Sequence, residues 1–163
     1  METVTVKEFT NMPRGRLGII PIRGSEALAK KINDYIVAFR KEFSIAHQDS
    51  IIFDGYHKEN FILNVEFPRF STGEGKCVIN DSVRGCDLFI VADCFNYNIT
   101  YNIYDLRDAN GNLLQVPMSP DNHFADVKRI ISACAGKAKR INVILSMLYE
   151  GRQHKRSMRE SLD

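Results

Sequence analysis

The order of apolar and polar positions predicts an α/β domain that opens with a strand, a turn and a helix. The apolar run at residues 17–22 breaks at Arg23-Gly24, and Ser25 then has the side chain of a helix N-cap. Apolar residues recur after it at helical spacing: Leu28, Ile32, Tyr35 or Ile36, Phe39 and Phe43. A strand that leads into an amphipathic helix is typical of the first unit of an α/β fold.

The middle of the chain predicts three further strands. Residues 61–66 and 76–81 are expected to form strands that flank a loop at residues 67–75, which holds one proline and two glycines. Residues 87–93 are almost continuously apolar. Such a run is typical of a strand that is buried on both faces of a sheet.

The second half of the chain has clear turn and cap signals. Residues 99–117 predict a β-hairpin, because alternating segments flank Asn110-Gly111. Ser119, Pro120 and a glycine at position 136 then predict a helix over residues 120–135. Its predicted apolar face comprises Phe124, Val127, Ile131 and Cys134. A buried strand is expected at residues 141–148, and residues 149–163 lose the apolar period.

Composition favours a single domain outside the membrane. The chain has 163 residues, of which 44% are hydrophobic and 26% charged. No apolar stretch approaches the ~20 residues of a membrane span, and the first residues lack a signal-peptide pattern, so a cytoplasmic protein without a membrane partner is expected. The four cysteines form no CxxC pair, which suits free, buried thiols: Cys77, Cys86, Cys94 and Cys134.

The distribution of charge is more informative than the net charge of +2. Residues 137–159 carry seven basic residues and one acidic residue, so the remainder of the chain is net acidic. Ligands of open α/β sheets bind beyond the carboxyl ends of the strands, and this basic run follows a predicted strand. The pattern predicts an anionic ligand there, although a basic run near a chain end can also be only a solvated surface.

Other candidate residues are ambiguous when taken alone. In the glycine-bearing loop, the Phe70 ring could stack on a base and Glu74 could accept a hydrogen bond from an exocyclic amine. Taken alone, however, Phe70 is better interpreted as an ordinary loop residue packed onto the domain. Asp121 and Asp126 are expected in the first turns of a helix, where a negative charge complements the helix dipole. The histidines lack metal-ligand spacing and are expected at the surface or in caps, with no metal site: His47, His57, His123 and His154.

Taken in order, three stretches resemble the N-terminal domain of ribose-phosphate pyrophosphokinases, also called PRPP synthetases. They are RFSTGEG at 69–75, VINDSVRGCDLFIVAD at 78–93, and the stretch from SPDN to QHKR at 119–156. The resemblance spans roughly residues 20–159. It implies a phosphoribosyltransferase-like, three-layer α/β sandwich with a mostly parallel sheet.

The same resemblance implies a domain organisation. Residues 1–163 would form a single N-terminal domain, with a core at 17–148, an inserted β-hairpin at 99–117 and a basic ATP-loop segment at 149–163. The C-terminal domain of the family is absent from this chain. The chain by itself is therefore expected to be an inactive part of a longer enzyme.

The implied activity transfers diphosphate from Mg-ATP to ribose 5-phosphate, which gives PRPP and AMP. Phe70, Thr72 and Glu74 fall at the positions that hold adenine, often in a neighbouring subunit, so a homo-oligomer is expected. The implied ATP contacts after the last strand are Arg152, Gln153, His154, Lys155 and Arg156. Ser82 and Arg84 match a regulatory phosphate site. No residue of this chain is assigned a certain catalytic role, and Mg²⁺ is expected to arrive with ATP.

Several positions depart from the family pattern. Thr72 replaces an asparagine or aspartate, His154 replaces an aspartate, and Ala92-Asp93 replaces glutamine and serine. These changes keep a second hypothesis open, a non-catalytic regulatory or scaffolding homologue. A third interpretation, an RNA-binding arm at the basic end, ranks last because the remaining surface is net acidic, and no nucleic-acid partner is predicted.

Overall fold

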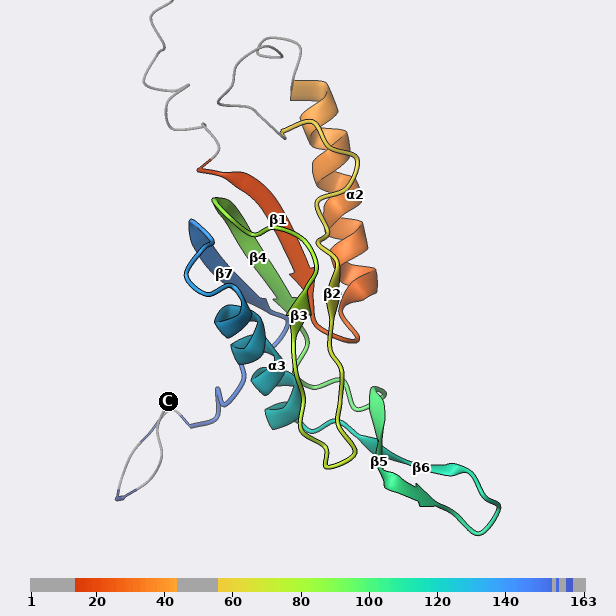
Figure 1. The fold of residues 1–163 in the computed structure, drawn as a ribbon. Coiled ribbons are helices and arrows are strands. Elements are labelled where there is room, and N and C mark those ends of the chain that lie inside the picture. The colour runs from red at the N-terminus through yellow and green to blue at the C-terminus, as the bar shows by residue number, and fades with distance from the viewer. Residues whose placement is uncertain (1–13, 44–55, 154, 156–157, 160–163) are drawn as a thin grey trace, which may run out of the picture.

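A parallel sheet of three strands forms the centre of the molecule, in a computed structural model that describes residues 14–43, 56–153, 155 and 158–159 (Figure 1). The strands are β1 (Arg16–Pro21), β4 (Cys86–Ala92) and β7 (Arg140–Leu145), in the order β1-β4-β7. In register, Leu88 of β4 lies opposite Gly18 of β1 and Ile141 of β7. The central strand β4 is buried at every position except Phe89, which is partly exposed, as its apolar sequence predicts.

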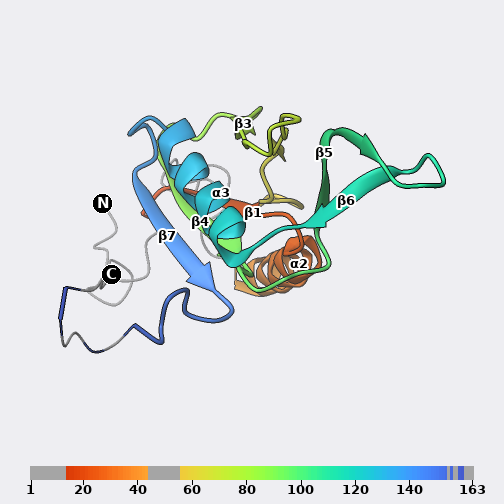
Figure 2. The ribbon, with the colours of Figure 1, turned by 90° about the horizontal axis from the view of Figure 1, so that it is seen from below.

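One helix lies on each face of this sheet. Helix α2 (Glu26–Phe43) packs Ala29, Ile32 and Ile36 against Ile19 and Val91. On the opposite face, α3 (Pro120–Ala133) contributes to a second apolar cluster with the sheet: Ile20, Leu88, Ile90, Val127, Ile130 and Cys134. The structure thus confirms a mixed α/β fold with a parallel sheet, and Figure 2 shows α2 and α3 on its two sides.

The sequence predicted both helices but only part of their buried faces. In α2, Ile32 and Ile36 pack against the sheet as predicted, whereas Leu28, Tyr35 and Phe39 are exposed, so the predicted apolar face is only partly right. The buried Asn33 explains the difference, because its side-chain oxygen accepts a 2.8 Å hydrogen bond from the backbone N–H of Phe61. In α3 the predicted Ile131 is likewise exposed, and Ile130 is buried in its place.

Two antiparallel strand pairs lie outside the central sheet. β2 (Val65–Glu66) pairs with β3 (Val78–Ile79), and both are shorter than the strands predicted at 61–66 and 76–81. β5 (Thr100–Arg107) and β6 (Leu113–Pro117) form a hairpin at the predicted place. Gly111, with φ of 84°, lies in its turn, and the hairpin extends away from the sheet (Figure 1).

Three further predictions are settled by burial. The expectation of a buried strand at 141–148 is wrong, because β7 is an edge strand that ends at Leu145 and leaves Val143 and Ile144 exposed. The expectation of a histidine at the surface or in a cap is wrong for His123, which is fully buried and donates from Nε2 to the Asn96 carbonyl at 2.9 Å, outside the helix. The cysteines are free thiols as predicted, and Cys86, Cys94 and Cys134 are buried.

Candidate functional site

The carboxyl ends of the three parallel strands lie at the same end of the sheet, and they bring segments that are distant in the sequence together there. The Asp93 backbone N–H, just past β4, donates to the Ser25 hydroxyl at 3.0 Å, just past β1. The Asp93 carboxylate accepts from the hydroxyl of Ser146, just past β7, at 3.1 Å. This edge is where ligands of open α/β sheets bind, and both predicted ATP-binding segments lie on its side of the molecule (Figure 1).

The loop of residues 69–75 is a tight turn that presents polar and aromatic side chains to solvent. The Phe70 N–H donates to the Glu74 carbonyl and the Gly73 N–H donates to the Phe70 carbonyl, both at 2.9 Å. Gly73 has φ of 92°, a conformation that favours glycine. The Phe70 side chain is 54% exposed and Glu74 is also exposed, so the loop offers a ring and a carboxylate to a ligand.

Thr72 contributes to the same loop through its hydroxyl. Thr72 Oγ1 donates to Glu74 Oε2 at 2.9 Å. This hydrogen bond restricts the rotamers of the Glu74 carboxylate. The residue that departs from the family pattern therefore orients the glutamate that the pattern assigns to adenine.

Beneath the loop, a buried ion pair connects it to α3. The Arg69 side chain is only 5% exposed and Asp126 only 1%, and Arg69 Nη2 lies 3.1 Å from Asp126 Oδ2. Arg129 Nη1 lies 2.6 Å from the other carboxylate oxygen, Oδ1. The Arg69 guanidinium also lies 5.2 Å from the ring centre of Tyr101 in β5. From the sequence, Asp126 was expected only to complement the helix dipole; this ion pair was not predicted, since 57 residues separate its partners.

The segment after β7 is anchored to the first turn of α3. The Tyr149 ring stacks on Phe124 with ring centres 4.3 Å apart, and the Tyr149 hydroxyl donates to Asp121 Oδ1 at 2.5 Å. This hydrogen bond to a carboxylate raises the pKa of Tyr149 far above its usual value, so the hydroxyl stays a donor at neutral pH. Tyr149 was not predicted as an anchor, because no local sequence signal marks it.

Beyond Tyr149 the backbone turns and presents the predicted phosphate-binding residues. Glu150 has φ of 57°, and its carbonyl accepts from the Gln153 N–H at 2.8 Å. Arg152 and Lys155 are exposed, and Gln153 is half-buried. The predicted contacts His154 and Arg156 lie outside the described residues.

The two predicted halves of the ATP site do not meet within one chain. In both views the loop of residues 69–75 and the segment that follows β7 lie apart, with α3 between them (Figures 1 and 2). The structure therefore brings Phe70, Thr72 and Glu74 together and separates them from Arg152 and Gln153.

The predicted regulatory residues lie at the opposite end of the sheet. Ser82 and Arg84 are exposed in the turn that precedes β4, where the Gly85 N–H donates to the Lys137 carbonyl at 3.0 Å. Beside this turn, Arg140 donates from Nε to Asp87 Oδ1 at 2.7 Å and from Nη2 to Oδ2 at 2.5 Å. This bidentate bond lowers the pKa of Asp87.

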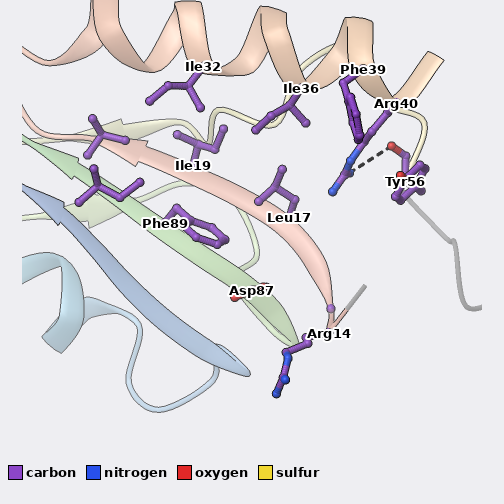
Figure 3. Close-up of a pocket in the computed structure, with 13 residues that line it drawn as sticks. Arg14, Leu17, Ile19, Ile32, Ile36, Phe39, Arg40, Tyr56, Asp87 and Phe89 are labelled. Carbon is purple, nitrogen blue, oxygen red and sulfur yellow. Dashed lines mark hydrogen bonds between the residues drawn. The ribbon is translucent and has the colours of Figure 1, made fainter. Parts of the chain in front are cut away.

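A pocket of about 460 Å³ lies between α2 and the sheet (Figure 3). The pocket is largely apolar, with Ile19, Ile36 and Phe89 among its lining residues. Arg40 and Tyr56 also line it, and Arg40 Nη1 donates a hydrogen bond to the Tyr56 carbonyl at 3.2 Å. None of the predicted ATP-binding residues lines it. The pocket is therefore separate from the candidate site at the carboxyl edge.

Neither a metal cluster nor a membrane helix is found within the part of the chain that the structure describes. No three His, Cys, Asp or Glu side chains there are grouped so that they could hold a metal ion. No helix of that part combines the length and the apolar character needed to cross a membrane.

Comparison with known proteins gives a consistent family and fold. The family model described as the N-terminal domain of ribose phosphate pyrophosphokinase matches residues 17–163. The crystal structure of phosphoribosylpyrophosphate synthetase from Mycobacterium smegmatis is similar, with a TM-score of 0.51, 22% sequence identity and coverage of 90% of this chain. This chain spans 35% of that protein's length. No curated protein sequence matches the chain.

Proposed function

Because the chain belongs to the family of ribose phosphate pyrophosphokinase N-terminal domains, we propose that it forms the ATP-side part of a ribose-phosphate diphosphokinase. That enzyme transfers diphosphate from Mg-ATP to the 1-hydroxyl of ribose 5-phosphate and produces PRPP and AMP. The observation that carries the proposal is the loop of residues 69–75, a single tight turn that presents the half-exposed Phe70 ring and the exposed Glu74 carboxylate, which accepts a hydrogen bond from Thr72.

The loop has the chemistry to recognise adenine. An exposed aromatic ring gains apolar contact area when a flat base stacks on it. A carboxylate beside the ring accepts a hydrogen bond from an exocyclic amine, and the Thr72 hydroxyl at 2.9 Å fixes that carboxylate before the ligand arrives. Phe70, Thr72 and Glu74 together would therefore favour adenine over a base that lacks the amine.

The basic segment has the chemistry to hold the phosphates. Arg152, Gln153 and Lys155, with His154 and Arg156 as further assigned contacts, supply cationic and amide donors after β7. Phosphoryl-type transfer depends mainly on positioning and on cations around the phosphate chain. Mg²⁺ prefers phosphate oxygens together with one or two carboxylates, so in this proposal it arrives with ATP rather than in a cage of protein ligands.

The separation of loop and segment within one chain supports a homo-oligomer, in which the loop of one copy completes the nucleotide site of another. We also infer the finer organisation: a phosphoribosyltransferase-like sandwich with its core at 17–148, the 99–117 hairpin as an insertion, and a basic ATP loop at 149–163. Ser82 and Arg84 are assigned to a regulatory phosphate site, and the protein to the cytoplasm.

A calorimetric titration with Mg-ATP tests the ATP assignment. Arg152→Ala is expected to weaken ATP binding at least about tenfold, because a charge-assisted contact to phosphate is lost. Arg107→Ala is the matched control, because it removes an arginine side chain from the hairpin instead. This variant should bind Mg-ATP with the affinity of the unaltered chain. Equal affinity in the two variants would contradict the assignment.

A second assay separates an enzyme from a non-catalytic homologue. The full-length gene product is incubated with Mg-ATP and ribose 5-phosphate, and AMP is measured. Formation of AMP supports the diphosphokinase. ATP binding without AMP would favour the regulatory or scaffolding homologue, in which Thr72 and His154 mark the loss of turnover.

A further inference from the structure

We propose that helix α3 positions both halves of the nucleotide site, through two separate anchors. Asp126 holds the loop of residues 69–75 by way of Arg69, and Asp121 with Phe124 holds the segment after β7 by way of Tyr149. The inference rests on the proposed function, since it takes the loop as the adenine side and the segment as the phosphate side. Asp126 and Asp121 are positioning residues and contact no ligand themselves.

The first anchor joins α3 to the backbone of the loop. The guanidinium of Arg69 donates from Nη2 to Asp126 at 3.1 Å and from Nη1 to the Gly73 carbonyl at 3.0 Å. A planar guanidinium holds both acceptors in one fixed geometry. Because both charged side chains are almost completely buried, water does not replace these bonds when one is broken.

The end of the loop rests on the same cluster. A Cβ atom added to Gly75 would lie 2.8 Å from Arg129 Nη1 and 3.3 Å from Arg69 Cζ. Gly75 is also bridged to Arg69 by antiparallel backbone pairing. The first residue of the loop, Arg69, is therefore one of the two arginines that Asp126 holds, and the last residue, Gly75, lies against both of them. Phe70 and Glu74 lie between these two fixed ends.

The second anchor joins α3 to the root of the phosphate segment. Tyr149 is fixed twice, by the 4.3 Å stack on Phe124 and by the hydrogen bond to Asp121. The turn that carries Arg152 and Gln153 begins directly after it. Tyr149 thus sets where this turn leaves the surface of the helix.

The two anchors lie on different sides of one helix. Residues five apart on an α-helix are separated by about 140° around its axis, so Asp121 and Asp126 point in different directions. This geometry accounts for the position of α3 between loop and segment in both views (Figures 1 and 2). Each anchor can therefore be removed without disturbing the other.

A crossed titration tests the inference, with ATP and inorganic tripolyphosphate as ligands, each with Mg²⁺. Asp126→Asn is expected to weaken ATP binding about tenfold, because the loosened loop must be ordered when adenine binds. Tripolyphosphate has no base, so its affinity should not change. Tyr149→Phe keeps the stack but removes the hydrogen bond to Asp121, and should weaken both ligands equally, by about threefold to tenfold.

Asp87→Asn is the matched control, because it also removes a carboxylate bound to arginine but lies at the opposite end of the sheet. It should change stability and leave both affinities unchanged. If Asp126→Asn fails to fold, Arg129→Gln replaces it. The Arg129 side chain is 30% exposed and holds only one oxygen of Asp126, so a smaller loss specific to ATP is expected.

The outcomes are distinguishable. If the unaltered chain binds both ligands and Asp126→Asn behaves as Asp87→Asn does, the inference is overturned and the proposed function stands. If Asp126→Asn weakens ATP and tripolyphosphate equally, a purely structural role is shown instead. If the unaltered chain binds neither ligand, the proposed function fails and this inference falls with it.

Discussion

Replacing Asp126 should destabilise the protein more than replacing Arg69, although the two residues form one ion pair. Asp126→Asn leaves the buried Arg69 guanidinium without a counter-charge, and removing one partner of a buried pair costs about 3–5 kcal/mol. Arg69→Met leaves Asp126 still paired with Arg129 at 2.6 Å. Its cost is then chiefly the lost charge-assisted hydrogen bonds, about 1.5–3 kcal/mol.

Urea unfolding followed by far-UV circular dichroism measures this difference, a suitable signal for a chain without tryptophan. The free energy of unfolding is compared at equal denaturant slope, so that a change in the unfolded state is recognised. The double variant should cost less than the sum of the two single changes, because the residues share one interaction. The reasoning is refuted if Arg69→Met is as destabilising as Asp126→Asn.

Two further predictions concern titrating groups. Arg140 lowers the pKa of Asp87, so this pair stabilises the folded state above the ordinary aspartate pKa of about 4, and the contribution is lost as the pH falls through the lower folded value. Urea midpoints measured down to pH 2.5 should therefore fall less in Asp87→Asn than in the unaltered chain; parallel curves would contradict this. Burial raises the pKa of Cys77 and of Cys94 to about 11, so both thiols should react slowly with a disulfide reagent at pH 8 and rapidly in urea; fast reaction of all thiols in the folded chain would contradict it.

The elements that the sequence predicted well are those with local signals. The Ser119 hydroxyl accepts from the Asn122 N–H at 3.2 Å, as an N-cap does, and Gly136 with φ of 68° follows the end of α3. Asn110-Gly111 likewise marks the turn of the hairpin. Each signal depends on residues within a few positions of one another, so a single sequence contains it in full.

The features that escaped prediction depend on distant residues. Asn33 is buried because it binds the backbone of Phe61, so the buried face of α2 includes a polar residue that apolar periodicity leaves out. The exposure of β7 follows from its place at the sheet edge, which the strand order sets. In the candidate site the residues proposed to face a ligand were assigned from motifs, and that assignment stays a prediction. The anchors Asp126 and Tyr149 were missed, because neither looks unusual beside its sequence neighbours.

Thr72 illustrates why a departure from a family pattern must be judged in the folded loop. A threonine in place of an asparagine or aspartate has a shorter polar group. From the sequence alone, this change suggests that the loop binds a base more weakly. In the structure the shorter hydroxyl instead donates to Glu74 at 2.9 Å, within a turn whose last residue lies against Arg69 and Arg129. A carboxylate held by a neighbour loses less rotamer freedom when a ligand binds, so in the proposed site the substitution would replace a direct contact at position 72 by a preorganised Glu74.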